Sequence, residues 1–320
     1  MKICAACIHL LPKEKFSKKQ WQLTQRRRCK QCIADNREVI LDAPDDAPPT
    51  PPPPSCAEGE GDISCNGNVL CWTDEDLFKQ SPPNEECPIC MLPMPFNDDE
   101  RQYYSCCGKI TCTGCVHADC TENNSKRCPF CRTPGPTSYK EYIKRIKKRV
   151  GADDSEATYN LGCYYSRGEL GLQQDRKKAF ALWLRAGELG HAAAYYNIGT
   201  DYYNGEEGAE RDVKKAKYYH ELAAMGGYVN ARYNLGCMEE EAGNMSRAVK
   251  HWMIAAGAGD DDSLSNIRGC FMSGHASKDD FEKALRAHKE SNDEMRSNQR
   301  EAAAPANRVV RATRDLQCRI

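Results

Sequence analysis

Residues 157–199 read ATYNLGCYYSRGELGLQQDRKKAFALWLRAGELGHAAAYYNIG, and the motif near the start of this stretch returns at its end. The motif Tyr159–Gly162 recurs at Tyr196–Gly199 and Tyr233–Gly236, and more faintly at Ser265–Arg268. The intervals are 37, 37 and 32 residues. Self-similarity at such a period indicates stacked units that share a core, because one unit cannot bury its own apolar face.

A second element keeps the same phase. A helical pattern begins at four alanines: Ala179, Ala216, Ala248 and Ala284. An Asx residue precedes each alanine by four positions, where its side chain is expected to cap the helix: Asp175, Asp212, Asn244 and Asp280. In the first three units a glycine follows eleven residues after the alanine. Each unit therefore predicts two antiparallel helices joined at a glycine turn.

These residues resemble the Sel-1-like repeat, a variant of the tetratricopeptide fold. The resemblance implies a mainly α protein with an α-solenoid over residues 153–295, whose concave surface takes a protein substrate. The fourth unit has Arg268 at the glycine position and Ser291 at an alanine position, so we expect a capping repeat. Cys163, Cys237, Trp183 and Trp252 are expected to pack inside the repeats. His191, His220 and His251 are expected on helix surfaces.

Residues 87–131 carry the densest part of the chain's twenty cysteines. Four pairs can be distinguished: Cys87 with Cys90, Cys106 with Cys107, Cys112 with Cys115, and Cys128 with Cys131. Zinc is usually held tetrahedrally by four thiolate or imidazole ligands, and a Cys-x-x-Cys turn presents two sulfurs to one ion. Eight ligands predict two zinc ions. These ions must supply much of the folding energy, since the segment has few large apolar residues.

This arrangement resembles an all-cysteine RING finger, a small α+β cross-brace module, over residues 87–135. In that family the pairs alternate, so the resemblance places Cys87, Cys90, Cys112 and Cys115 on one zinc. Cys106, Cys107, Cys128 and Cys131 hold the other. The adjacency of Cys106 and Cys107 departs from the family, and Lys109 stands where an alternative alignment has a histidine ligand. His117 and Cys120 are the reserve candidates for that second site.

The RING resemblance implies an E3 ubiquitin ligase with no catalytic residue of its own, because such a module acts by positioning. Ile89 and Pro129 match positions that contact the ubiquitin-conjugating enzyme, and Arg132 matches a position that braces the charged ubiquitin. Two other interpretations stay open. In one, the finger is a zinc-binding scaffold in a non-enzymatic adaptor. In the other, Arg132 is a solvated surface charge.

Residues 1–40 form a basic module with two further pairs, Cys4 with Cys7 and Cys29 with Cys32. Four sulfurs at this spacing predict one structural zinc. The module faintly resembles the LIM-like zinc finger of a fungal adaptor that links small-RNA machinery to chromatin. Its lysines and arginines suit phosphate contacts, although a solvated exterior explains them equally well, so nucleic-acid binding is a secondary hypothesis.

The remaining segments connect these modules. Residues 41–86 predict an acidic, proline-rich linker in which Cys56, Cys65 and Cys71 lack a partner pattern. Residues 138–152 predict a connecting helix with a stripe of Tyr142, Ile143 and Ile146, and residues 296–320 predict a tail.

Composition narrows the class of protein further. The net charge is −1, and no apolar run approaches the length of a secretory signal or a membrane span, so we expect no membrane partner. Cysteine pairs that serve as zinc thiolates require a reducing compartment, which favours the cytoplasm or the nucleus. No phosphate-binding glycine loop or catalytic triad is apparent, which argues against any enzyme other than a ubiquitin ligase.

Overall fold

The structure is a computed structural model that describes residues 2–3, 10–11, 72–79, 85–123, 127–206 and 210–304. Strands β1 (Lys2–Ile3) and β2 (Leu10–Leu11) pair antiparallel. The four cysteines of the amino-terminal module and most of the acidic linker lie outside the described residues. The chain divides into two compact units, Met1–Thr73 with Ser138–Tyr219 and Asp74–Thr137 with His220–Ile320.

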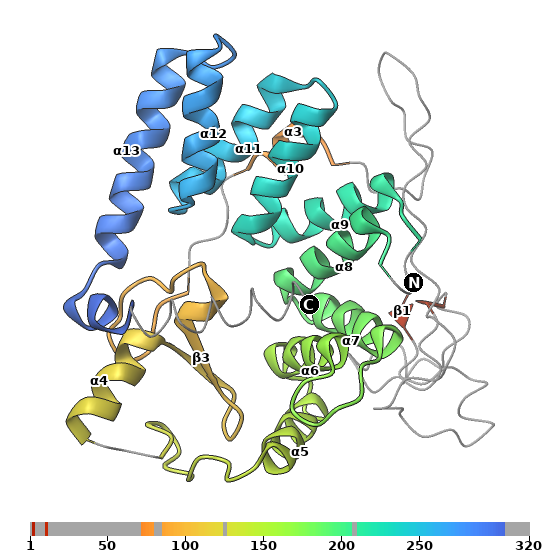
Figure 1. The fold of residues 1–320 in the computed structure, drawn as a ribbon, viewed down its shortest axis with the longest axis vertical. Helices are drawn as coiled ribbons and strands as arrows, with labels where there is room; N and C mark the ends of the chain where they lie inside the picture. Colours follow the sequence, from red (N-terminus) through yellow and green to blue (C-terminus); the bar gives the residue numbers. More distant parts are fainter. Residues whose placement is uncertain are drawn as a thin grey trace. The chain divides into compact units, whose positions relative to one another are not determined.

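The first unit is built from helices that follow one another along the chain (Figure 1). They are α5 (Tyr139–Val150), α6 (Ser155–Arg167), α7 (Arg176–Glu188), α8 (Ala192–Asn204) and the first half of α9 (Val213–Met225). The stripe predicted on the connecting helix is confirmed, because Ile143 and Ile146 are buried and the Tyr142 hydroxyl lies 3.0 Å from that of Tyr164. Helix α5 therefore covers the open side of the first repeat.

The second unit combines the cysteine-rich segment with the last helices. In chain order its elements are α3 (Asp74–Leu77), η2 (Asp98–Glu100), β3 (Arg101–Tyr104), β4 (Lys109–Cys112), α4 (Thr113–Asn123), the end of α9, α10 (Val229–Glu241), α11 (Met245–Gly257), α12 (Asp261–Met272) and α13 (Lys278–Met295). Strands β3 and β4 form an antiparallel hairpin in which Arg101 pairs with Cys112. The prediction of a mainly α protein is confirmed.

The repeat motif fills the space between paired helices. Leu161, Ile198 and Leu235 are fully buried, and so are the tryptophans Trp183 and Trp252. A Cβ atom on Gly162 would lie 2.7 Å from the Trp183 ring, and one on Gly236 would lie 2.3 Å from Nε1 of Trp252. Real Cβ atoms do not approach so closely, so glycine is required for each tryptophan to pack against the preceding helix.

The predicted Asx caps differ among the four units. Asp175 accepts a hydrogen bond from the backbone N–H of Lys178, and Asp212 accepts one from Lys215. Asn244 is at the N-cap of α11 but makes no side-chain cap bond. The prediction for Asp280 is wrong: Ser277 caps α13, and Asp280 completes a capping box three residues later.

The prediction that the histidines lie on helix surfaces is wrong for two of them. His220 and His251 are 1% and 0% exposed. His220 follows Ala216 by four residues, the place that Trp183 and Trp252 hold in their repeats, so the repeat packing buries it. His191 is half-buried, stacks on Tyr159 and lies 3.0 Å from a Glu156 oxygen.

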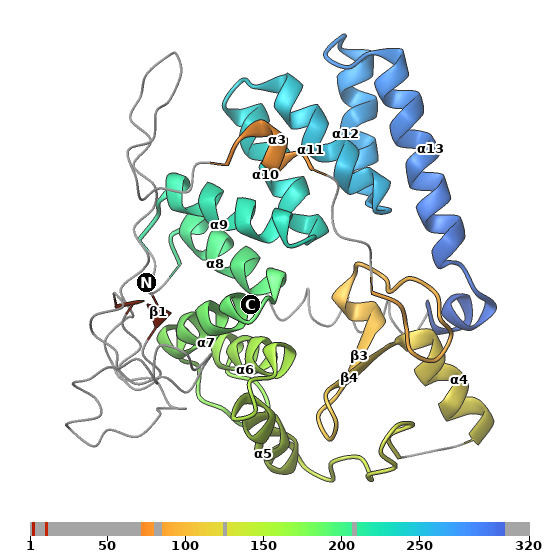
Figure 2. The same ribbon diagram turned by 180° about the vertical axis from the view of Figure 1, so that it is seen from behind.

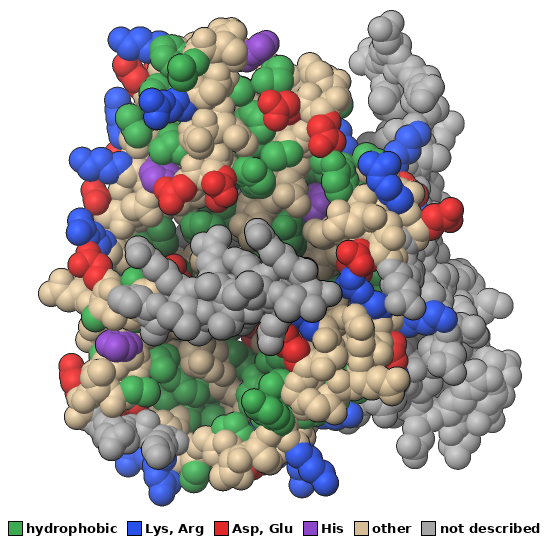
Figure 3. All heavy atoms as spheres, viewed as in Figure 1, with side chains coloured by type: hydrophobic (Ala, Val, Ile, Leu, Met, Phe, Trp, Pro, Cys, Tyr) green, Lys and Arg blue, Asp and Glu red, His purple; other side chains and the backbone are tan. Residues whose placement is uncertain are grey.

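The final helix pair differs from the others. Helix α13 has 18 residues, whereas α12 has 12, and the two lie side by side in both views (Figure 2). Acidic and basic side chains intermingle along α13, where Lys278 pairs with Glu282 and Lys283 with Asp279 (Figure 3). None of the helices in the described part of the chain is long and apolar enough to cross a membrane.

Candidate metal centre

Two turns of the cysteine-rich segment have the same sequence pattern and the same backbone. They are Glu86–Pro93, ECPICMLP, and Arg127–Pro134, RCPFCRTP. In each turn the backbone carbonyl of the first cysteine accepts a hydrogen bond from the backbone N–H of the residue that follows the second cysteine. The distances are 2.8 Å from Met91 and 2.9 Å from Arg132. Both of these residues have φ of +58°, which closes the turn. The result presents two sulfurs to one side of each turn.

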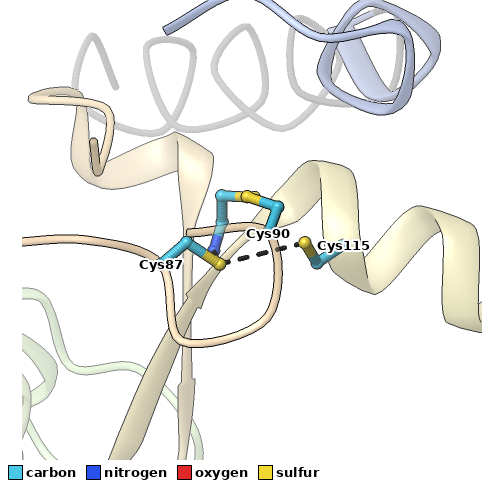
Figure 4. Close-up of side chains that lie close together, drawn as sticks. Cys87, Cys90 and Cys115 are labelled. Carbon is cyan, nitrogen blue, oxygen red and sulfur yellow. Dashed lines mark hydrogen bonds between the residues drawn. The ribbon is translucent and has the colours of Figure 1, made fainter. Parts of the chain in front are cut away.

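The eight sulfurs form two groups, within each of which all sulfurs lie within 4.8 Å of one another. The first group is Cys87, Cys90, Cys112 and Cys115, and the second is Cys106, Cys107, Cys128 and Cys131. Figure 4 shows the Cys87 and Cys115 sulfurs facing each other beside Cys90, at a separation of 3.8 Å. The pairs alternate along the chain between the two groups, so the β3–β4 hairpin has cysteines in both groups, whereas α4 contributes Cys115 to the first group alone.

The spacing of the sulfurs fits a tetrahedral metal. Zinc–sulfur bonds of about 2.3 Å place the sulfurs of a tetrahedral site about 3.8 Å apart. The sulfur–sulfur separations are 3.8 Å for Cys90 to Cys112, 3.6 Å for Cys107 to Cys128 and 3.4 Å for Cys131 to Cys106. All eight thiols are free, and a disulfide would require about 2.05 Å. The two groups could each hold a metal ion.

The electrostatics of the two groups also favour a cation. Burial raises the pKa of Cys87, but surrounding backbone N–H groups outweigh this effect and bring the pKa down to about 7. Thr133 lowers the pKa of Cys131 to about 6. Burial and neighbouring thiols raise the pKa values of Cys106 and Cys115. Each group thus opposes the crowding of further negative charge, which a divalent cation would relieve.

Adjacent Cys106 and Cys107 both join the second group. They lie in the turn between β3 and β4, where the Cys107 N–H donates to the Tyr104 carbonyl and Gly108 has φ of +75°. The reserve candidates His117 and Cys120 are on α4 and belong to neither group. The turn between β3 and β4 therefore supplies two sulfurs from adjacent residues, whereas the other three pairs have the spacing Cys-x-x-Cys.

One contact to the first group has no signal in the sequence. Residues 298–304 are helical, and the Arg300 guanidinium donates to the Cys90 sulfur at 3.6 Å. Burial lowers the pKa of Arg300, but hydrogen bonds to the Cys112 and Cys90 sulfurs outweigh burial and raise it. Gly114 permits this approach, because its Cβ would lie 2.8 Å from the Arg300 backbone nitrogen. Part of the predicted tail therefore packs on the metal centre.

The three predicted contact residues are on the surface of the two turns. Ile89 is 45% exposed and lies between the ligands Cys87 and Cys90. Pro129 and Arg132 are exposed in the turn of Cys128 and Cys131. The two turns contribute to different groups, so an apolar side chain stands beside each metal site.

Comparison with known proteins gives a family for part of the chain. The family model described as "Sel1 repeat" matches residues 155–191 and 192–228. These residues are two Sel1 repeats. Their bounds follow the helix pairs α6 with α7 and α8 with α9. The sequence-based prediction of Sel1 repeats is confirmed for these two units.

Solved structures are similar over about half of the chain. A Sel1 repeat protein from Oxalobacter formigenes is 26% identical over 47% of this chain and 63% of its own, with a TM-score of 0.42. A protective antigen of uropathogenic Escherichia coli that displays an SLR fold is 26% identical over 47% of this chain and 33% of its own, with a TM-score of 0.41. The match thus spans less than two thirds of either protein. A comparison with curated proteins gives no match.

Sel1 repeats imply protein–protein interaction, and so a protein partner. The function that follows directly is therefore protein binding by the repeats, next to two cysteine groups that could hold metal ions.

Proposed function

We propose that the chain is a RING-type E3 ubiquitin ligase that binds a ubiquitin-conjugating enzyme through its zinc finger and a protein substrate through its Sel1 repeats. Zinc in both cysteine groups supplies the folding energy of the finger. Two ions in the finger and one in the amino-terminal module make up the proposed metal content. The activity belongs in the cytoplasm or nucleus, where cysteine thiols stay reduced.

The observation that carries this proposal is the exposure of apolar side chains on the two metal-binding turns. Ile89 and Met91 are 45% and 65% exposed, and Pro129 is exposed on the equivalent turn. A small zinc-stabilised module has few apolar residues, and leaving several of them in water indicates a surface that another protein covers. The conjugating enzyme is the partner proposed for this surface.

The residues of the finger would act by positioning. Ile89 and Pro129 hold the conjugating enzyme, and the Arg132 guanidinium braces the ubiquitin that the enzyme carries. Arg132 is exposed and directly follows Cys131, so its guanidinium is accessible to a partner. The finger supplies no nucleophile, so its contribution is the orientation of the thioester for attack by a substrate lysine.

The test is ubiquitin-chain formation by the purified full chain with a panel of conjugating enzymes. Ile89→Ala is expected to abolish chains without changing zinc content, because Ile89 is not a ligand. Val213→Ala is the matched control: it removes an aliphatic side chain that is 43% exposed on a repeat helix. Equal loss in both variants, or full activity in Ile89→Ala, would count against the proposed contact.

The second candidate is a non-enzymatic adaptor in which the same modules assemble other proteins. The Sel1 repeats favour it, since their interaction role requires no ubiquitin. Nucleic-acid binding by residues 1–40 belongs to this alternative and would weaken steeply with salt. A chain that binds zinc and protein partners yet forms no ubiquitin chains with any conjugating enzyme would establish the adaptor.

A further inference from the structure

A short acidic segment of the chain is docked on the third helix pair. Helix α3, residues Asp74–Leu77, lies against α10 and α11 in both ribbon views (Figures 1 and 2). Leu77 is 1% exposed, and Nη1 of Arg232 donates to the Leu77 carbonyl at 2.5 Å. That carbonyl has no partner within so short a helix, so the arginine satisfies it.

The flanks of the segment contact charged groups. The Arg247 guanidinium forms an ion pair with Asp74 and lies 3.0 Å from a Glu239 oxygen. The Phe78 ring lies 4.7 Å from the His251 ring. Arg247 and Lys250 lie over the same ring, at 5.3 Å and 5.2 Å from its centre. Side chains of α10 and α11 thus contact an acidic group, a buried leucine and an aromatic ring of one short segment.

The third helix pair has a polar face at positions where the first two pairs do not. Counting from the repeat motif and from the repeat alanine, the third pair places Arg232, Glu239 and His251 at three positions. The first repeat has Thr158, Tyr165 and Leu182 there, and the second has Tyr195, Tyr202 and Tyr219. Arg232, Glu239 and His251 are no more than 2% exposed beneath α3. Buried charge is costly unless it is paired: Glu239 accepts from Arg247 and Asn244, and Arg232 donates to the Leu77 carbonyl of α3.

Helix α3 satisfies only part of the hydrogen-bonding capacity of Arg232. Burial lowers its pKa to about 10. Its Nε has no hydrogen-bond partner among the described residues, and its Nη1 donates to a carbonyl instead of a carboxylate. Helix α3 has four residues, of which Leu77 is buried and the three acids are exposed, so it is a minimal ligand. A partner that offers a second acceptor to Arg232 would bind more tightly.

We propose that Arg232, Glu239, Arg247, Lys250 and His251 form a peptide site on α10 and α11. The site recognises a short acidic segment of a partner protein that ends in leucine and an aromatic residue. Asp74–Phe78 is then an internal ligand that competes for the site. Because a tethered ligand acts at an effective concentration in the millimolar range, partners must outcompete it.

The experiment measures binding of a fluorescein-labelled peptide with the sequence of residues 72–80 to the full chain by anisotropy. The double variant Asp74→Ala with Phe78→Ala, called the opened chain, loses the ion pair and the ring contacts of α3, so that Leu77 is held less tightly and can be displaced. Circular dichroism checks that the repeats stay folded. The opened chain is expected to bind the peptide roughly tenfold or more tightly than the wild-type chain. Glu75→Gln, at an exposed position of α3, is expected to match the wild-type chain.

Two further variants establish specificity. A peptide with alanine at the positions of Leu77 and Phe78 is expected not to bind, and Arg232→Leu in the opened chain is expected to abolish binding. A folded, opened chain that does not bind the peptide would show that α3 is only a structural strap. Equal binding by wild-type and opened chains would show that α3 does not compete. Neither outcome depends on ubiquitin transfer, so this inference goes beyond the proposed ligase activity.

Discussion

Gly236 and Trp252 set the separation of α10 and α11, as Gly162 and Trp183 do for the first pair. Each tryptophan is buried, and its indole edge occupies the volume that a Cβ on the glycine would need. A glycine inside a helix costs about 0.5–1 kcal/mol relative to alanine. Retaining it is favourable only because the tryptophan packing contributes more.

Gly236→Ala should therefore destabilise the second unit by about 1–3 kcal/mol, the usual range for overpacking a tight interior. Urea unfolding followed by tryptophan fluorescence measures the change. Gly269→Ala is the control, because a Cβ at Gly269 on α12 meets no atom within 4 Å. That variant should be neutral or slightly stabilising. Equal destabilisation by both would refute the proposed steric cause.

Arg300 acts on the metal centre at the same scale. The Arg300 guanidinium donates to the Cys90 sulfur, and with a divalent ion bound it would offset part of the charge of four thiolates. Arg300→Gln should release zinc from the first group roughly 10-fold faster, in line with the loss of other partners that support metal ligands. A chelating dye monitors the release.

The control for Arg300 is Arg296→Gln. Arg296 is in the same segment and pairs with exposed Glu301, away from the sulfurs. Its zinc release should match the wild type. If Arg300→Gln accelerated neither phase, or both phases equally, in a two-phase zinc release, the contact to Cys90 would have no role in holding the metal.

Helix α9 is the element in which a titratable residue replaces a tryptophan. Burial lowers the pKa of His220 to about 4, from an ordinary value near 6.5. The folded state therefore holds the imidazole neutral, whereas the unfolded chain takes up a proton as the pH falls below about 6.5. Stability that is complete above pH 6.5 is lost between about pH 6.5 and pH 4.

His220→Leu should remove this part of the pH dependence. Each pKa unit corresponds to about 1.4 kcal/mol, so the wild type should lose about 3 kcal/mol over that range in excess of the variant. Unfolding free energies of the wild type and of His220→Leu, measured at several pH values, give this difference. Zinc loss at low pH affects both proteins equally and cancels. Parallel curves for the two proteins would mean that His220 is not kept neutral by the fold.

At the scale of the whole molecule, the metal centre belongs to the same compact unit as the last two helix pairs. Arg300 carries a contact from the far end of the chain to Cys90, across 210 positions of sequence. The cysteine groups and the last two helix pairs therefore belong to one compact unit, although all eight cysteines come from residues 87–131.

Metal analysis of the full chain should give about three zinc ions, two in the described groups and one in residues 1–40. Cys90→Ser with Cys112→Ser should remove one ion, and Cys4→Ser with Cys7→Ser should remove another. Chelation should leave most of the helical circular dichroism, because the repeats fold through apolar packing. Zinc content unchanged by Cys4→Ser and Cys7→Ser would rule out the amino-terminal site.

Local patterns in the chain were sufficient to predict the helix pairs, the turn glycines and the cysteine pairs, because each depends on neighbours a few positions away. Tyr159–Gly162 and its repeats, and Cys87 with Cys90, are of this kind. The burial of His220 follows from its place four residues after Ala216, where the first and third repeats have tryptophan. Contacts between distant residues were not predictable: Arg300 at Cys90 and Arg232 at Leu77. Their chemistry depends on which surfaces meet, and the tertiary structure alone decides that.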